Sequence, residues 1–315
     1  MSIDKGRFLK KINIIFFFFL IFMVANIILS PTRFIDSAMD GISAWTFNVL
    51  PSVLPFMIIT KLIGNTGVLE KIFSKLKNPM TKLYGTSSIS AYIFFMSILS
   101  GYPVGSKMIA DLYESGKITR EDAFKMSSFC SNSGPMFIIG SVGVKMLNSP
   151  LFGYILLLSH IFSALLNGLI YKKIKVKEEV LKTRNEIKNN VDFKDVILSS
   201  NQAILSVGAI IMFFFIVVEC LSPIFNIFPP LVSSFLCGCI EITKGCLELS
   251  ILPISSKIIL PICSFVITFG GFSTIMQSIT LLKKVKLKTS LFTLFKFTQA
   301  LISSALTFAI CLIVF

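Results

Sequence analysis

The sequence predicts an all-α polytopic membrane protein, built as an inverted-repeat bundle with two re-entrant hairpins and two broken helices. Hydrophobic residues make up 54% of the 315 residues and charged residues only 15%, where a soluble domain carries about 25% charged residues. The apolar residues come in long blocks, and two block-breaking motifs recur at nearly one spacing. These three observations decide the fold class.

Nine apolar blocks have roughly the 20 residues that a helix needs to cross a bilayer. They are residues 12–30, 43–63, 88–110, 126–147, 151–171, 197–220, 230–252, 257–281 and 291–315. The first block follows four basic residues and resembles a signal peptide. It is too long for a signal core and no small-x-small cleavage site follows it, so it is interpreted as an uncleaved first span.

Basic residues cluster in the connections between the blocks. Three connections are lysine-rich: residues 71–82, 172–195 and 283–288. Three others, residues 31–42, 148–150 and 221–229, contain a single basic residue in total, Arg33. Because basic loops remain in the cytoplasm, we expect the N-terminus and the three lysine-rich connections on that side and the C-terminus outside. The net charge of +14 is thus explained by topology, and no nucleic-acid partner is predicted.

This topology requires hairpins. Three blocks separate each pair of successive lysine-rich connections, but a return to the same side needs an even number of crossings. One block of each trio must therefore enter and leave by one face. Residues 88–112, broken at Gly101 to Gly105, and 230–252, broken near Gly238 and Gly245, are the candidates, since broken backbone survives at membrane depth only in a buried or watery place.

An internal repeat supports the same arrangement. Ser100-Gly101-x4-Ser106-Lys107 recurs as Cys237-Gly238-x4-Thr243-Lys244, at an offset of 137 residues. The pattern of 128–135 recurs at 264–271, at an offset of 136 residues. Each half then holds a hairpin followed by a broken spanning helix, in opposite orientations. Such inverted repeats indicate the binding site of a transporter.

The broken helices carry the candidate polar sites. Gly134 and Pro135 free backbone groups beside Asn132 and Ser133, which predicts a substrate site; the alternative is a kinked helix whose polar residues bond neighbouring helices. Its counterpart in the second half contains Thr268, Gly270, Gly271, Ser273 and Gln277, with the same two interpretations.

Two charged residues inside apolar segments have open roles. Glu241 predicts coupling to a proton or Na⁺, because buried carboxylates mark ion pathways; alternatively it forms a static pair with Lys244 on the same helix face. Lys107 either attracts an anion to a helix terminus or extends to the cytoplasmic surface.

Enzyme chemistry is not predicted. The sequence shows no nucleophile–base set, phosphate loop or metal-ligand cluster, and most of its seven cysteines are apolar fillers without ligand spacing. His160, the only histidine, is expected to be an interior polar contact. We expect no metal and no cofactor beyond a coupling proton or Na⁺.

These motifs resemble those of the YlbJ-type sporulation integral membrane proteins (SpoVV), of the nucleoside-recognition or Gate-domain group. The likeness spans roughly residues 40 to 280 and rests on segments 48–56, 100–107, 111–113, 128–135, 238–243 and 270–273. It implies a fold akin to concentrative nucleoside transporters. It also implies a role in sporulation, namely transport of dipicolinic acid across the outer forespore membrane from the mother cell.

The resemblance and the patterns together define four regions. These are an N-terminal span with its external connection (1–42), a first Gate-like repeat (43–171), a basic cytoplasmic linker (172–196) and a second, inverted Gate-like repeat (197–315). The expected substrate-binding residues are Gly101, Tyr102, Pro103, Gly105, Ser106, Lys107, Ser131, Asn132, Ser133, Gly134, Pro135, Gly238, Thr243, Thr268, Gly270, Gly271, Ser273 and Gln277, with Glu241 for ion coupling.

The leading hypothesis is a secondary transporter of a small anionic metabolite in the lipid bilayer. Two alternatives stay open: a transporter of nucleoside-like or ionic substrates, and a non-transporting membrane scaffold for spore-envelope assembly. A scaffold would not need two hairpins and a buried glutamate, but it would need a soluble binding surface. Further partners open to the chain are a second copy of itself or other sporulation membrane proteins.

Overall fold

The computed structural model describes residues 3–75, 77–176 and 192–315, and this part of the chain is helical without strands. The first half contains α1 (Ile3–Leu29), α2 (Pro31–Ala44), the wide π-type helix η1 (Trp45–Val49), α3 (Leu50–Asn65), α4 (Val68–Ser74), α5 (Lys77–Tyr84), α6 (Ile89–Ser100), α7 (Val104–Glu114), α8 (Arg120–Ser127), the π-type η2 (Met136–Met146) and α9 (Pro150–Tyr171). The second half contains α10 (Phe193–Phe225), α11 (Pro230–Ile240), α12 (Ile242–Ser250), α13 (Ser256–Phe269), α14 (Gly271–Leu282), the short η3 (Lys283–Val285) and α15 (Thr289–Val314).

The predicted membrane class is confirmed. Among the described residues, five helical stretches are long and apolar enough to cross a bilayer: Pro31–Asn65, Pro150–Tyr171, Phe193–Phe225, Ser256–Val285 and Thr289–Val314. A sixth is formed if Asn78–Tyr84 and Ile89–Ser100, which meet at 82°, are counted as one span. Large apolar side chains such as Leu158, Phe162 and Leu205 are exposed on these helices, as expected for residues that face lipid.

The region 31–42, predicted to be a connection, is the helix α2. Pro31 is at its first turn, where a proline needs no hydrogen bond. Phe34, Ser37, Gly41 and Ala44 recur at helical spacing and are buried, and Ser37 Oγ donates to Phe215 O of α10 at 3.1 Å. The polar residues of the other face concealed this helix in the sequence. Through η1 it continues into α3.

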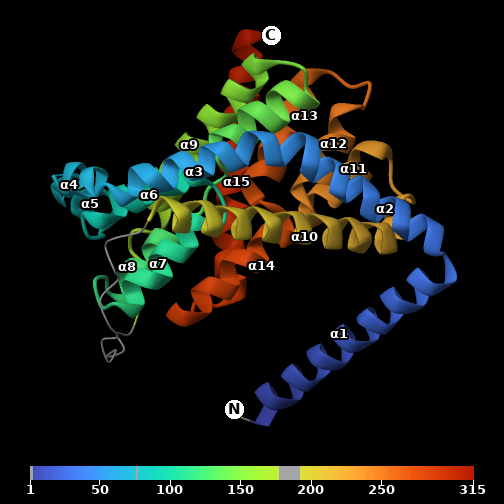
Figure 1. Ribbon diagram of the computed structural model, residues 1–315, viewed down its shortest axis with the longest axis horizontal. Coiled ribbons are helices and arrows are strands. Elements are labelled where there is room, and N and C mark those ends of the chain that lie inside the picture. Colours follow the sequence, from blue (N-terminus) through green and yellow to red (C-terminus); the bar gives the residue numbers. More distant parts are fainter. Residues whose placement is uncertain (1–2, 76, 177–191) are drawn as a thin grey trace.

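The helices form two crossing groups. In Figure 1, α2–α3 and α10 run across the picture, whereas α9, α13, α14 and α15 run mainly from top to bottom. Within each group the members contact one another: α2 and α3 pack on α10, and α15 packs on α9 and α13. The crossing leaves the hairpins and the helix breaks near the middle of the molecule.

Both predicted hairpins are present. A Cβ built on Gly105 would lie 2.7 Å from Ser97 Cβ, and one built on Gly245 would lie 2.1 Å from Gly238 Cα. In a continuous helix, residues seven or eight apart are separated by roughly 10–12 Å. The chain therefore turns back at Gly101–Pro103 between α6 and α7, and at Glu241 between α11 and α12.

Both predicted broken helices are confirmed as well. In the first, Ser131 to Gly134 are non-helical between α8 and η2. In the second, Gly270, at φ 85°, separates α13 from α14. Each half thus contains a hairpin, a broken helix and an uninterrupted helix, α9 or α15, in this order. The opposite orientation of the halves, and the entry and exit of each hairpin by one membrane face, remain predictions.

The region from α7 to α8 contacts the lysine-rich connection at 283–288 and the residue that follows α5. Lys284 Nζ donates to Glu114 at 2.6 Å. Arg120 Nε donates to Val285 O at 3.1 Å, and Lys125 Nζ to Gly85 O at 3.1 Å. Residues 177–191 of the predicted basic linker lie outside the described residues.

This arrangement makes a topology prediction. In a cysteine-free background, single cysteines at the exposed positions Lys75 and Lys284 should react with an impermeant thiol reagent only from the cytoplasmic side. A cysteine at the exposed Lys145, at the end of η2, should react only from outside. Labelling of intact cells and of inverted vesicles checks this; reaction of Lys75→Cys and Lys284→Cys from opposite faces would contradict the shared cytoplasmic side.

Candidate functional site

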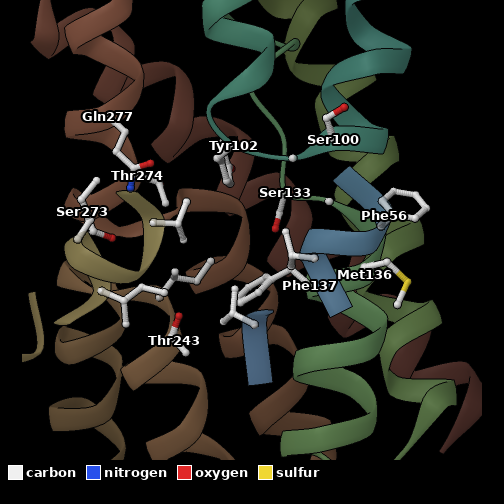
Figure 2. Close-up of a pocket in the computed structure, with 18 of the residues that line it drawn as sticks. Phe56, Ser100, Tyr102, Ser133, Met136, Phe137, Thr243, Ser273, Thr274 and Gln277 are labelled. Carbon is white, nitrogen blue, oxygen red and sulfur yellow. The ribbon is translucent and has the colours of Figure 1, made fainter. Parts of the chain in front are cut away.

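A cavity lies where the four helix breaks meet. Its lining includes Ser100, Gly101 and Tyr102 of the first hairpin, Ser133 and Gly134 of the first broken helix, Glu241, Ile242 and Thr243 of the second hairpin, and Ser273, Thr274 and Gln277 of α14. Figure 2 shows the residues of the first half and those of α12 and α14 on opposite sides of this cavity. Three helix breaks, together with α14, which follows the fourth break at Gly270, therefore line one site.

The remaining wall of the cavity is apolar. It is formed by Val49, Val53 and Phe56 of η1 and α3, Leu99 of α6, Met136 and Phe137 of η2, and Val207, Ile210 and Ile211 of α10. A largely apolar lining with a few polar groups is typical of small-molecule pockets. It suits a flat, partly apolar molecule with polar substituents.

The structure brings only part of the predicted site together. Eight predicted residues line the cavity: Gly101, Tyr102, Ser133, Gly134, Glu241, Thr243, Ser273 and Gln277. Eleven others do not line it: Pro103, Gly105, Ser106, Lys107, Ser131, Asn132, Pro135, Gly238, Thr268, Gly270 and Gly271. Most of the second set shape the breaks or pack behind them, and substrate contact by the first set remains a prediction.

Glu241 is the one charged residue among the residues that line this cavity. It precedes the first turn of α12, and its Oε2 accepts a hydrogen bond from the Lys244 backbone N–H at 2.7 Å, which is the geometry of a helix N-cap. Its Oε1 has no partner among the described residues although the side chain is 1% exposed. One carboxylate oxygen therefore caps α12, and the other makes no recorded hydrogen bond among the described residues although Thr243 lies beside the carboxylate.

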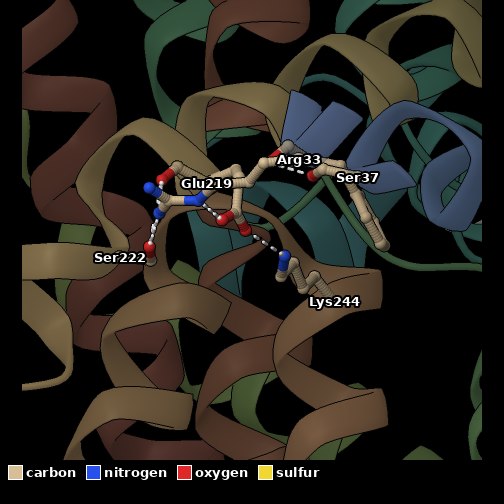
Figure 3. A network of polar contacts seen from close by, with 6 residues as sticks. Arg33, Ser37, Glu219, Ser222 and Lys244 are labelled. Carbon is tan, nitrogen blue, oxygen red and sulfur yellow. Dashed lines mark hydrogen bonds and ion pairs between the residues drawn. The ribbon is translucent and has the colours of Figure 1, made fainter. Parts of the chain in front are cut away.

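The alternative of a static Glu241–Lys244 side-chain pair does not match the structure. Lys244 Nζ instead lies 3.8 Å from Glu219 Oε2 of α10, and Glu219 also pairs with Arg33 of α2. Figure 3 shows Glu219 between these two cations. Because the Lys244 ammonium is directed to Glu219, only its backbone N–H reaches Glu241.

Lys107 is far less buried than a substrate residue would be. Its side chain is exposed and does not line the cavity. Of its two predicted roles, the structure favours the surface lysine over the one that attracts an anion.

Asn132 lies in an interior hydrogen-bond network behind the cavity. Its Nδ2 donates to Ser97 Oγ at 2.9 Å and to Phe129 O at 2.7 Å, and its Oδ1 accepts from Gln299 Nε2 at 3.1 Å. Both amide protons and the oxygen are therefore used within the protein, and the side chain is 1% exposed. These contacts agree with the alternative interpretation, in which the polar residues bond neighbouring helices.

We therefore expect Asn132→Ala to affect stability more than substrate affinity. The substitution leaves the buried Ser97 and Gln299 groups without their partner, which costs roughly 1–3 kcal/mol for each unsatisfied group. The thermal melting temperature of the purified protein in detergent should fall. The ligand affinity of the folded fraction should stay within about threefold of the wild-type affinity. An unchanged melting temperature with a tenfold or greater loss of affinity would restore the substrate role.

His160 is an interior contact, as predicted. Its Nε2 accepts from the Ser133 N–H at 3.1 Å, and its Nδ1 lies 2.8 Å from Thr268 Oγ1. The Ser133 N–H requires a free lone pair at Nε2, so Nδ1 carries the proton and donates to Thr268. Thr268 then donates to Ser303 Oγ of α15 at 3.0 Å. The histidine thereby fixes one helix break relative to the other.

Lys296 and Gln299 of α15 are polar residues that the sequence did not indicate. Lys296 is 1% exposed, and its Nζ donates to Ser131 O at 2.8 Å and to Gln299 Oε1 at 2.9 Å. Nζ also lies 5.0 Å from the ring centroid of Tyr102, which lines the cavity. The available signal was their spacing of three residues, on one face of an apolar helix.

The chain is similar to a protein whose name places it among sporulation membrane proteins. It is 26% identical over 322 residues to the sporulation integral membrane protein YlbJ of Bacillus subtilis (strain 168), and the match covers 89% of this chain and 78% of that protein. No family model and no solved structure matches the chain. The similarity thus extends over most of both proteins rather than over a single motif.

Proposed function

The chain belongs to the YlbJ-type family of sporulation integral membrane proteins, and from this premise we propose that it is a secondary transporter of a small anionic metabolite. By resemblance the substrate is dipicolinic acid and the membrane is the outer forespore membrane. The observation that carries the proposal is the single cavity at which four helix breaks meet. Discontinuous helices around a common site are typical of secondary transporters.

The lining of the cavity supports a planar aromatic acid. The apolar wall of α3, η2 and α10 suits an aromatic ring, and the polar residues of the lining offer hydrogen-bond donors for carboxylates. Among these donors are the Ser133 and Ser273 hydroxyls and the backbone N–H groups at the start of α14, where the helix dipole favours negative charge. The Ser273 hydroxyl is buried and has no partner among the described residues.

The Glu241 carboxylate gives the site a coupling group. A second negative charge in the cavity opposes an anion, so an anionic substrate binds best when Glu241 carries a proton or contacts a cation. Oε1, which has no partner among the described residues, is available for either. We propose that this charge balance couples substrate movement to a proton or Na⁺.

The same carboxylate is also the observation that favours the second candidate, a transporter of nucleoside-like molecules. A free carboxylate oxygen accepts hydrogen bonds from sugar hydroxyls without needing a coupled ion. The non-transporting scaffold has less support, because it gives no role to a cavity lined by unpaired polar groups.

Uptake into proteoliposomes distinguishes these functions. Wild-type protein should accumulate labelled dipicolinate above the level of protein-free liposomes, and unlabelled dipicolinate should compete more strongly than a nucleoside such as uridine. Competition by uridine alone would favour the nucleoside-like candidate. Absence of uptake for both compounds, with correctly inserted protein and with a proton or Na⁺ gradient of either direction, would leave the scaffold.

A further inference from the structure

The cavity has no basic residue in its lining, although the proposed substrate is an anion. Behind that lining lies Lys296 of α15, whose Nζ contacts the ring of Tyr102. We propose that Lys296 is the positive charge that recognises a substrate carboxylate. This inference rests on the proposed transport of an anion and adds the residue that selects for charge.

The surroundings of Lys296 satisfy its hydrogen bonds but leave its charge without a counter-ion. Its two recorded acceptors, Ser131 O and Gln299 Oε1, are neutral, and its third neighbour is the face of the Tyr102 ring. Among the described residues, every recorded ion pair involves other cations: Arg33, Lys125, Lys244 and Lys284. A charged side chain inside a membrane protein is strongly unfavourable without such a partner.

The position of Tyr102 makes contact between Lys296 and a ligand geometrically feasible. The ring lines the cavity on one side and lies 5.0 Å from Lys296 Nζ. Its hydroxyl donates to Thr268 O at 3.2 Å, a single hydrogen bond at the turn of the first hairpin. Rotation of this ring would remove a group that lies between the Lys296 ammonium and the cavity.

The first broken helix links the same lysine to the lining. Ser131 O accepts from Lys296, and Ser133 and Gly134, two and three residues later, line the cavity. A substrate carboxylate can therefore replace the Ser131 carbonyl as acceptor with a short movement of a flexible side chain. A charged acceptor binds an ammonium group more strongly than a neutral one.

The test compares two ligands of the same shape on purified full-length protein: dipicolinate, with two carboxylates, and its neutral diamide, pyridine-2,6-dicarboxamide. Lys296→Met removes the charge with little change in length, and Lys296→Arg keeps it. We expect Lys296→Met to weaken dipicolinate binding about 100-fold, with diamide affinity changed less than about threefold. Lys296→Arg should retain most dipicolinate affinity.

The opposing outcomes are separable. Equal losses for both ligands in Lys296→Met would show a packing role and overturn the inference, as would unchanged dipicolinate binding. If Lys296→Met does not fold, the wild-type protein still decides: similar affinities for dipicolinate and diamide would mean that no positive charge contributes. Binding of neither ligand to the wild-type protein would overturn the proposed function itself.

Discussion

Glu241→Gln is expected to abolish ion-driven uptake while leaving the protein folded. Glutamine keeps an oxygen that accepts the Lys244 N–H, so the start of α12 retains its cap. It cannot, however, exchange a proton or neutralise a cation at Oε1. Loss of a charged interaction with the coupling ion of about 3 kcal/mol lowers the gradient-driven uptake rate roughly 100-fold. The measurement is dipicolinate uptake into proteoliposomes with and without an imposed pH or Na⁺ gradient.

Glu248→Gln is the matched control for this variant. Glu248 is a second carboxylate on α12, but it lies near Cys237 and Lys244 in a separate polar pocket and does not line the central cavity. Its substitution should leave the gradient dependence intact. Equal effects of both substitutions, or full gradient-driven uptake by Glu241→Gln, would remove the coupling role from Glu241.

Gly105→Ala should prevent the first hairpin from closing. An added Cβ would lie 1.8 Å from Cys130 O and 2.7 Å from Ser97 Cβ, so the backbone of α7 must move away from the first broken helix. Overpacking of this kind costs about 3 kcal/mol, and the backbone carbonyl of Cys130 cannot rotate away as a side chain would. We expect little folded protein in the membrane fraction and a large fall in melting temperature.

Gly140→Ala is the corresponding control in η2. Its added Cβ would meet only Met136 Cε at 3.3 Å and Ser52 Cβ at 3.4 Å, and the end of a methionine side chain adapts readily. Alanine should therefore be neutral there, or stabilising by about 0.5–1 kcal/mol within a helix. A folded, active Gly105→Ala protein would show that α6 and α7 pack less closely than the structure indicates.

The helices and their breaks could be predicted from the sequence because they follow from local chemistry. Apolar length predicts a span, and Gly101, Pro103, Gly134 and Gly270 interrupt helices whatever surrounds them. α2 was missed because its buried face consists of only four residues, Phe34, Ser37, Gly41 and Ala44, among polar residues on the other face. That helix is recognisable only once α10 covers it.

The composition of the site could be predicted less well, because neighbouring residues in a non-helical segment point in different directions. Asn132 is directed to Ser97 and Gln299, whereas Ser133, the next residue, lines the cavity. Which of the two faces the cavity depends on the packing of α15 and α6, and no local pattern carries that information. The apolar wall from α3 and α10 was also missed, because only the packing of these helices brings their residues to the cavity.

Substrate is proposed to pass through the cavity between the four helix breaks, and a pair of substitutions on α10 tests this path. Val207 lines the cavity, and Leu205, two residues before it, is 59% exposed on the outer surface. Val207→Trp places an indole ring in the substrate's space, and Leu205→Trp adds the same ring on the lipid-facing side. At matched membrane abundance, dipicolinate uptake should fall at least about tenfold in Val207→Trp, as expected for steric exclusion from a close-packed site. Uptake should stay near the wild-type level in Leu205→Trp. Wild-type uptake by Val207→Trp would contradict transport through this cavity.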